Sequence, residues 1–464
     1  MDHLQNVLSY FDQQQPLCAE HDRIPKDLYR EFGVKAGLRD ETGKGVLAGL
    51  TNISDIRAFQ YVDGVKHPAD GQLLYRGYDV KDLINGSRGS RFAFEEAAYL
   101  LLFGHLPDQE QYDMFKRLLH DFTDLPQNFT EDMILKNPSH NVMNKLGRSV
   151  LALYSCDPDP DSLSVENMMR QSIELIARFP VIAAYAYVVK RHYFDNDSLY
   201  LHRPEPELST AENFLRMIRP DKRFTHEEAR LLDLCLVCHA EHGGGNNSTF
   251  TCRSVSSTGT DTYSAIAAAV GSLKGPKHGG ANRQVLAQFS LIKQTVRDWK
   301  DDDAVADCVG RILRRELGDG SGLIYGMGHA VYTLSDPRTV ILRQSARTLA
   351  AQRGMLDELE LMEAVERVTP RVFAEVTGHE KVMCANVDMY SGLIYQMLDI
   401  PSDLFTPLFA VARITGWCAH RMEEVLTGGR LYRPAYKSLT RHREYIPMAA
   451  RTYRKNPLPA EKRD

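Results

Sequence analysis

Hydrophobic positions recur at helical spacing over most of the chain. From Phe92 onward, segments such as FEEAAYLLLFG, QEQYDMFKRLLHDF and VENMMRQSIELIARFP place apolar side chains three and four positions apart. That period is typical of an amphipathic helix with one face turned toward a core. The pattern therefore predicts a mainly α protein.

Local capping chemistry indicates where several of these helices begin. One begins at Thr225, with Glu228 three residues later as a capping box, and ends before the glycines at 243–245. A second begins near Asp261 and is ended by a glycine and a proline. A third opens at Asp336, which is followed by proline in the first helical turn. Each of these helices borders a glycine-rich turn.

Between Ser54 and Asp79 the pattern changes from helical to strand-like. The segments IRAFQYV and QLLYRGY flank the turn-forming DGVKHPADG, which predicts two short strands joined by a turn. Residues 1–50 are expected to form an irregular or short-helix lead-in. The predicted fold is thus mainly α, with a small β-hairpin near the N-terminus.

Composition indicates an ordinary globular protein. The chain has 464 residues, 43% hydrophobic and 25% charged, which suggests two or three structural units and a sizeable core. A net charge of −5 gives no global attraction for nucleic acid or an anionic membrane. The polar N-terminus does not resemble a secretory signal, and no apolar stretch is expected to approach the roughly 18 residues that span a bilayer. Eight scattered cysteines fit free thiols, so we expect a cytoplasmic protein.

Candidate chemistry gathers in four glycine-flanked segments. They combine histidine or aspartate with helix ends and tight turns, and they are HAEHGGGN (239–246), GPKHGGAN (275–282), GMGHAVYTLSDPR (326–338) and NVDMYSG (386–392). Such turns let a ligand approach the backbone and its unpaired N–H groups. Arg413 and Arg433 follow, and the planar fork of arginine suits a carboxylate ligand. Each residue alone is an ordinary polar group, but together they indicate a site for an anionic substrate.

Three other interpretations of the first segment are weaker. Cys235, Cys238 and His239 match the spacing of c-type haem attachment, but they lie in a helix with apolar neighbours, as buried thiols do. His239 and His242 lie three apart on one helix, yet no nearby carboxylate or thiolate completes a metal site convincingly. The sequence HGGGN is similar to the oxyanion loop of esterases, but no G-x-S-x-G elbow accompanies it. No metal site and no haem are predicted.

Taken together, four motifs resemble those of citrate synthases. They are LLYRGYDVKDL, GPKHGGAN, GMGHAVY followed by DPR, and NVDMYSGLIYQMLDIPSDLFTPLFAVARITGW, in the family's order and at similar spacing from about Gln72 to Leu439. The resemblance implies an almost entirely helical fold with a large domain, a small domain and a catalytic cleft between them. By analogy the large domain spans 1–278 and 391–464, and the small domain spans 279–390. The resemblance also implies at least a homodimer.

The resemblance implies a catalytic role for three residues. His278 would hydrogen-bond the thioester carbonyl of acetyl-CoA while Asp388 removes a proton from its methyl group. The resulting enol or enolate needs a positioned donor in a water-poor site. His329 would polarise the ketone of oxaloacetate, which the enol carbon attacks.

The resemblance also implies residues that bind the substrates. His242, Arg338, Arg413 and Arg433 would hold oxaloacetate and citrate, and Arg433 would reach the site of the partner subunit. For CoA, the loop before His329 would lie against the adenine, and basic side chains would lie near the phosphates. These candidates are Leu323, Ile324, Tyr325, Gly326, Met327, Gly328, Arg343, Arg347 and Lys381. No cofactor is required, since acetyl-CoA is a substrate.

The implied activity is that of a (si)-type citrate synthase of the tricarboxylic acid cycle. It would condense acetyl-CoA with oxaloacetate and hydrolyse citryl-CoA. A 2-methylcitrate synthase that uses propionyl-CoA remains open, because one methylene in an apolar pocket is worth only about 1–3 kcal/mol. A citrate-cleaving lyase and a non-catalytic binding protein are further alternatives. Two positions depart from the family pattern: Gly243, where many relatives have glutamate, and Ala385, where proline is usual.

Overall fold

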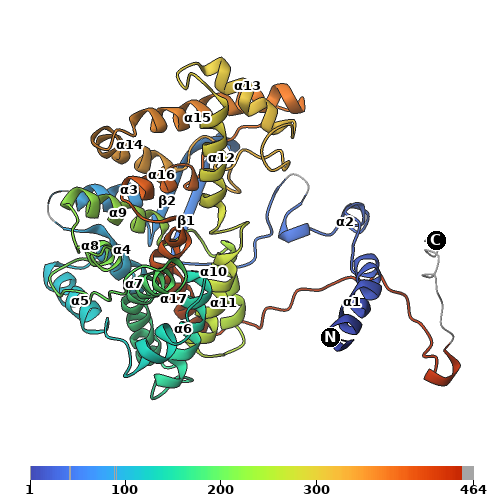
Figure 1. Cartoon of the computed structure of the whole chain (residues 1–464), viewed down its shortest axis with the longest axis horizontal. Helices are drawn as coiled ribbons and strands as arrows, with labels where there is room; N and C mark the ends of the chain where they lie inside the picture. The colour runs from blue at the N-terminus through green and yellow to red at the C-terminus, as the bar shows by residue number, and fades with distance from the viewer. Residues whose placement is uncertain (1, 41–42, 88, 90, 452–464) are drawn as a thin grey trace. The chain divides into compact units, whose positions relative to one another are not determined.

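The segments with helical periodicity form helices, and the structure is predominantly helical. The computed structural model describes residues 2–40, 43–87, 89 and 91–451, and the chain divides into one unit of 49–432 and another of 1–48 with 433–464. The larger unit holds the following helices (Figure 1): α3 (Val80–Gly86), α4 (Ala93–Phe103), α5 (Gln109–Asp121), α6 (Val142–Leu153), α7 (Val165–Asp195), α8 (Thr210–Ile218), α9 (His226–His239), α10 (Asn247–Ser256), α11 (Thr262–Lys274), α12 (Ala281–Thr295), α13 (Asp302–Leu313), α14 (Pro337–Gln352), α15 (Leu356–Thr377), α16 (Asp388–Met397) and α17 (Phe405–Thr427). The prediction of a mainly α fold is confirmed.

The predicted helix starts are confirmed at their caps. The Thr225 side chain accepts the N–H of Glu228, whose carboxylate accepts the N–H of Thr225, and this capping box begins α9. The Asp261 side chain accepts a backbone N–H at the start of α11, and Asp336 does the same for α14, which has proline in its first turn. The caps hold the ends of these helices beside the glycine-rich turns.

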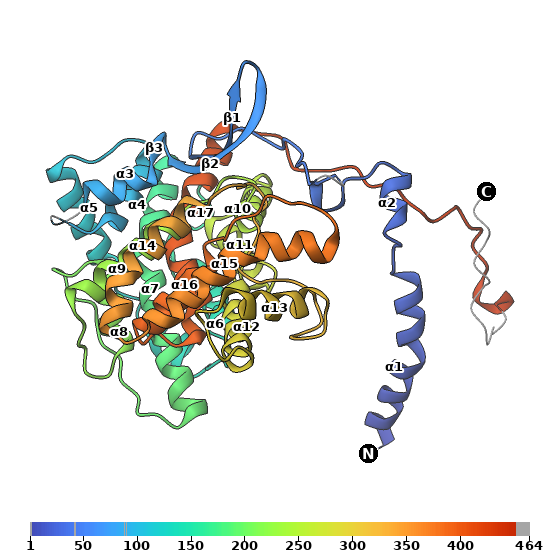
Figure 2. The same ribbon diagram turned by 90° about the horizontal axis from the view of Figure 1, so that it is seen from above.

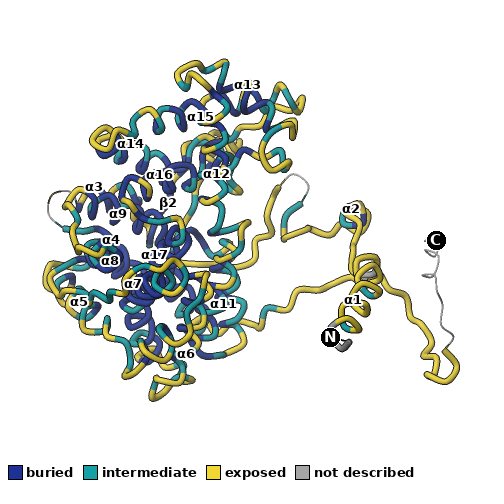
Figure 3. Tube along the Cα trace, viewed as in Figure 1, coloured by how far each residue is buried: buried dark blue, intermediate teal, exposed yellow. Residues whose placement is uncertain are grey.

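Two long helices form the centre of the larger unit. Most residues of α17 and of α7 are buried, and Figure 3 shows both as dark blue segments inside the other helices. By length and composition alone, α7 could cross a membrane, because an 18-residue window has a mean hydropathy of 1.5. The expectation that no apolar stretch approaches this length was therefore wrong. In this structure 94% of that window is buried inside the protein, as in a core helix.

A small antiparallel sheet precedes the helices. Strands β1 (Ser54–Val62) and β2 (Val65–Tyr75) pair from Ser54 with Tyr75 to Val62 with Val65, and the two-residue β3 (Tyr78–Asp79) joins β2. The hairpin turn is Asp63-Gly64, and both residues have positive φ, as a type I′ turn requires. Figure 2 shows the tip of β1 and β2 projecting away from the helices. The predicted hairpin is confirmed, but its turn is shorter than predicted. Residues 65–71, which were expected in the turn, form the first part of β2, and β3 is an addition.

The smaller unit contains more helix than the sequence predicted. Residues 1–50 were expected to be irregular or in short helices, whereas α1 (Asp2–His21) has 20 residues. It is followed by α2 (Asp27–Glu31) and a 3₁₀ turn at Ala36–Leu38. Within this unit, the ammonium group of Lys437 lies 6.0 Å from the ring centre of Phe32.

The boundaries of the predicted small domain stay a prediction. Figure 1 shows α12, α13, α14, α15 and α16 gathered at one end of the larger unit. However, residues 49–432 form one unit by their contacts, which do not separate the segment 279–390.

Candidate active site

The glycine-flanked segments lie at the ends of helices. His239 ends α9, and His242 lies in the turn that follows it, so the expectation that both histidines lie on one helix was wrong. His278 lies in the turn between α11 and α12, and His329 in the loop before α14. Asp388 is the first residue of α16. The backbone N–H and C=O groups at helix ends are not all used in helical hydrogen bonds, so a ligand can bind to them.

One group of side chains surrounds the ring of Tyr332. The ring centres of His242 and His329 lie 5.1 Å apart, and they lie 5.5 and 4.6 Å from that of Tyr332. The guanidinium carbon of Arg338 lies 5.9 Å from the same ring centre. Two of the predicted histidines and one predicted arginine therefore share one cluster.

A second group surrounds the ring of Phe409 on α17. The guanidinium carbon of Arg413 lies 4.7 Å from its ring centre, and the ring centres of His239 and His278 lie 4.3 and 6.1 Å away. Arg413 also donates from Nε to the backbone oxygen of His239 at 2.7 Å. This group brings together residues that lie as much as 174 positions apart in the sequence.

A short backbone bridge connects the His329 loop to Asp388. Gly328 N–H donates to the oxygen of Cys384, and Asn386 N–H donates to that of Gly326, both at 2.8 Å. The Asn386 side chain donates to the oxygen of Gly328 and accepts the N–H of Asp388. Ala385 lies inside this bridge, but its own N–H is not one of the two donors. Alanine in place of proline therefore leaves the bridge intact.

Asp388 has the properties of a general base. One carboxylate oxygen, Oδ1, is buried and has no hydrogen-bond partner within the described part of the chain. The pKa of Asp388 is raised to about 7, mainly by burial. The positive charge of Arg338 opposes this increase, and the negative charge of Asp336 adds to it. A base with a pKa near the working pH is well matched to proton abstraction.

His278 is neutral at physiological pH. Burial lowers the pKa of His278 to about 4, and the Arg413 guanidinium adds to this effect. Its Nε2 lies 3.1 Å from both Asn246 Oδ1 and Ser248 Oγ. Ser248 Oγ in turn accepts the indole N–H of Trp417 at 3.1 Å. Because Nε2 is engaged, Nδ1 is the ring nitrogen that can face a ligand.

His329 has a defined tautomer. Its Nδ1 accepts the backbone N–H groups of Val331 and Tyr332, both at 3.0 Å. A nitrogen that accepts cannot also carry the proton in a neutral ring, so the proton lies on Nε2. His329 can therefore donate one hydrogen bond through Nε2.

The two predicted site arginines of the larger unit differ in their partners. Arg413 is fully buried, and its terminal nitrogens Nη1 and Nη2 have no hydrogen-bond partner among the described residues. Burial lowers the pKa of Arg413 to about 10, although Glu241 raises it. Arg338, by contrast, donates from Nε and Nη2 to the two oxygens of Asp336 at 3.0 and 2.6 Å. A buried guanidinium with two unused donors is suited to a carboxylate ligand.

Several buried polar atoms of this region lack protein partners. Within the described chain they include both ring nitrogens of His239, Nε2 of His242, the hydroxyl of Tyr332, and the Asp388 and Arg413 atoms above. Such atoms are rare in folded proteins, because each is costly unless a ligand or water satisfies it. His239 and Tyr332 lie in the candidate segments 239–246 and 326–338, but the sequence analysis gave neither a role of its own. Among the described residues, no group of three or more metal-ligating side chains is arranged to hold a metal ion.

The predicted CoA residues fall into a loop and a set of basic side chains. Residues 323–328 form a loop held by Gln288, which donates to the oxygen of Leu323 and accepts the N–H of Tyr325. Arg343 and Arg347 are paired with glutamates of α15, and Lys381 is exposed. A phosphate at these two arginines would have to compete with the glutamates.

Arg433 belongs to the other unit, where it is exposed. The structure of the larger unit therefore contains all the predicted catalytic residues and three of the four predicted oxaloacetate residues.

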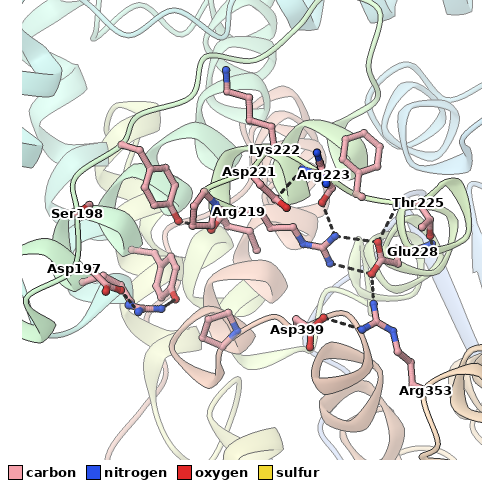
Figure 4. Close-up of a pocket in the computed structure, with 17 residues that line it drawn as sticks. Asp197, Ser198, Arg219, Asp221, Lys222, Arg223, Thr225, Glu228, Arg353 and Asp399 are labelled. Atoms are coloured by element: carbon pink, nitrogen blue, oxygen red, sulfur yellow. Dashed lines mark hydrogen bonds and ion pairs between the residues drawn. The ribbon is translucent and has the colours of Figure 1, made fainter.

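A large hollow of the larger unit lies away from these residues. It has a volume of about 1190 Å³, and none of the predicted site residues lines it. Figure 4 shows Arg219 and Arg353 both directed at Glu228, and Arg353 also pairs with Asp399. Two of the arginines that line this hollow are thus already paired with carboxylates.

Comparison with known proteins agrees with the motifs. The family described as citrate synthase, C-terminal domain, matches residues 38–435. A citrate synthase of Synechocystis is 35% identical over 88% of this chain and 92% of its own length. A 2-methylcitrate synthase of Corynebacterium glutamicum is 32% identical over 88% of this chain and 97% of its own length.

Two solved structures share the fold of this chain. A crystal structure of citrate synthase from Pyrobaculum aerophilum has a TM-score of 0.72 and 28% identity, covering 88% of this chain and 95% of that one. The citrate synthase of Thermoplasma acidophilum, solved as a ternary complex with carboxymethyl coenzyme A and oxaloacetate, has a TM-score of 0.72 and 26% identity, covering 88% and 97%.

Proposed function

The chain belongs to the citrate synthase family, and we propose that it condenses acetyl-CoA with oxaloacetate and hydrolyses the resulting citryl-CoA. Membership makes it an enzyme, an acyltransferase that converts the acyl group into an alkyl group on transfer. The observation that carries the proposal is Asp388, a buried carboxyl with a pKa of about 7. The charge of Arg413, whose terminal nitrogens are unpaired among the described residues, acts both on Asp388 and on the neutral His278.

The first step would form the enol or enolate of acetyl-CoA. Asp388 takes a proton from the methyl group while His278 donates from Nδ1 to the thioester oxygen. For Nδ1 to donate, Nε2 must accept, and the Ser248 hydroxyl at 3.1 Å would supply this bond by turning its proton from Asn246 Oδ1, to which it donates at 3.0 Å, toward Nε2. Because both groups are removed from bulk water, the developing charge is stabilised by fixed donors.

The second step would join the enol carbon to the ketone carbon of oxaloacetate. His329 donates from Nε2 to the ketone oxygen, on which negative charge develops as the carbon–carbon bond forms. Arg413 offers two unused donors to a substrate carboxylate. Arg338 would reach a second carboxylate by sharing its fork with Asp336, or by exchanging that partner. Water then cleaves the thioester, releasing citrate and CoA.

Assembly and location are parts of the same proposal. We propose a cytoplasmic homodimer in which Arg433 of one subunit completes the oxaloacetate site of the other. Its placement on an exposed segment outside the larger unit supports such a role. We also propose that the loop 323–328, with Arg343, Arg347 and Lys381, contacts CoA.

The specific acyl substrate has one serious alternative. Relatives named 2-methylcitrate synthase are almost as similar to this chain as those named citrate synthase, at 32% against 35% identity. The substrates of the two reactions differ by one methylene in the acyl group of the thioester. The same catalytic groups can process either thioester.

Free thiol release tests the proposal directly. CoA release is measured from acetyl-CoA and from propionyl-CoA, each with and without oxaloacetate, beside an Asp388→Ala variant. Rapid release that needs oxaloacetate, prefers acetyl-CoA and is lost in the variant supports a citrate synthase. A preference for propionyl-CoA assigns the alternative, and no release from either thioester refutes both.

A further inference from the structure

Glu241 is a fully buried carboxylate that the proposed reaction does not use. It lies between His239 and His242 in the sequence and has no exposed surface. Its Oε1 accepts three hydrogen bonds: from the Ser54 hydroxyl at 2.8 Å, from His420 Nε2 at 2.9 Å and from the N–H of Gly243 at 2.5 Å. Burial alone would raise its pKa, but the hydrogen bonds from His420 and Ser54 and the positive charge of Arg413 lower the pKa of Glu241 below its ordinary value. Glu241 is therefore charged at neutral pH.

Glu241 and its neighbours fix the backbone on both sides of His242. The Tyr75 hydroxyl lies 3.2 Å from both the N–H and the carbonyl oxygen of Glu241. On the other side, Gly243 is held by the Glu241 carboxylate with φ at +83°. A φ of +83° is a backbone conformation that residues other than glycine adopt only with strain, so the turn favours glycine at this position.

His420 donates to Glu241 in one tautomer only. Arg253 Nη1 lies 3.0 Å from His420 Nδ1, and a guanidinium can only donate, so Nδ1 accepts. The proton of the neutral ring therefore lies on Nε2, which faces Glu241. Arg253 is itself held by Glu423 and Glu424 at 2.6 and 2.8 Å. The donor that fixes Glu241 is thus oriented by a second layer of ion pairs.

The His242 ring is anchored mainly through a hydrogen bond to its own backbone. Its Nε2 is buried without a hydrogen-bond partner within the described residues. The rings of His329 and Tyr332 pack against it edge-on, but such contacts do not hold Nε2 in one direction. The direction of Nε2 then depends on the backbone turn that carries the ring.

We propose that Glu241 and His420 are positioning residues, which hold the 241–243 turn so that His242 Nε2 points at bound oxaloacetate. The inference rests on the proposed function, because it takes oxaloacetate as the ligand of His242. Neither residue touches the substrate. A positioning role predicts that their loss weakens oxaloacetate binding selectively, whereas a purely structural role predicts lower stability with no such selectivity.

The test compares three variants with a matched control. Glu241→Gln removes the charge that attracts three donors, and His420→Leu removes one donor. His420→Gln keeps an amide donor for Glu241 and a carbonyl acceptor for Arg253. Glu228→Gln is the control, because Glu228 is also a buried carboxylate with a pKa lowered by arginine, at the opposite end of α9. Steady-state kinetics give the KM of each substrate, calorimetry gives the Kd of oxaloacetate alone, and thermal unfolding gives stability.

We expect Glu241→Gln and His420→Leu to raise the KM and Kd of oxaloacetate about 10- to 100-fold, the range that one charge-assisted hydrogen bond supplies. The KM of acetyl-CoA should change less than about twofold, and His420→Gln should restore oxaloacetate binding to within about threefold of the unmodified protein. Glu228→Gln should lower only the unfolding temperature.

An unchanged oxaloacetate Kd in Glu241→Gln and His420→Leu would overturn the inference, as would an equal loss in His420→Gln and His420→Leu. Oxaloacetate binding by the unmodified protein without CoA release would refute the proposed function but leave this inference standing. No oxaloacetate binding by the unmodified protein would overturn both.

Discussion

Replacing Asp388 by asparagine should stabilise the unliganded protein while abolishing turnover. The side chain keeps its shape, but the group can no longer ionise. Asp388 has a pKa of about 7 instead of the ordinary 3.8, because burial and Asp336 disfavour its charged form more than Arg338 and Arg413 favour it. An ionised Asp388 is therefore a source of instability in the folded protein.

The magnitude follows from the pKa. Each tenfold change in acidity corresponds to about 1.4 kcal/mol, so the ionised carboxylate costs the folded state about 4 kcal/mol above pH 7. Below pH 3.8 the carboxyl is protonated in both states and costs nothing. Between these values the folded state binds a proton that the unfolded state lacks, so this contribution to stability falls as pH rises. Because the buried amide needs partners too, we expect a net gain of about 2–3 kcal/mol at pH 8.

Unfolding by urea at pH 5 and pH 8, without substrates, measures the effect. The gain in stability from Asp388→Asn should be largest at pH 8 and clearly smaller at pH 5, while CoA release from acetyl-CoA is lost. Asp303→Asn is the control, because that side chain is 92% exposed and should change stability little at either pH. Destabilisation by Asp388→Asn at pH 8, or an equal gain at both pH values, would refute the reasoning.

Three further predictions concern the substrate-facing groups. Arg413→Met should weaken oxaloacetate binding at least about 100-fold without lowering the unfolding temperature, because the guanidinium is buried with two unused donors; calorimetry and thermal unfolding check this. Ser248→Ala should lower kcat/KM for acetyl-CoA about tenfold with the oxaloacetate KM unchanged, as steady-state kinetics will show, because it removes the donor to His278 Nε2. The pH profile of kcat/KM for acetyl-CoA should rise through about pH 7 as Asp388 ionises, and it should show no step from His278 above pH 5, because the pKa of that histidine is about 4.

Helix starts could be predicted from the sequence because capping is local. Thr225 and Glu228 satisfy each other within one turn, and Asp336 lies directly before its proline. The length of α1 could not be predicted in this way, since its mixed apolar and polar residues carry no strong cap or period. The burial of α7 inside the protein could not be predicted from the sequence either, because the same composition fits a core helix and a membrane span.

The candidate site was predictable in its residues but not in their partners. Glycine-flanked histidines and Asp388 can be found by motif, since ligand contact needs open backbone at those points. Whether an arginine is unpaired depends on the whole fold. Arg413 has unused donors because its neighbours are Phe409 and the backbone of His239, whereas Arg338 meets a carboxylate two residues away. His239 and Tyr332 were given no role of their own for the same reason.

The polar residues of the buried helix α17 contact residues of the candidate site. Phe409, Arg413, Trp417 and His420 are spaced four, four and three apart, so they share one helix face. Trp417 donates to Ser248, which contacts His278 on the side proposed for the thioester. His420 donates to Glu241, which holds the turn of His242 on the side proposed for oxaloacetate. One core helix thus supports both halves of the proposed reaction, which is why its buried face carries Arg413 and His420.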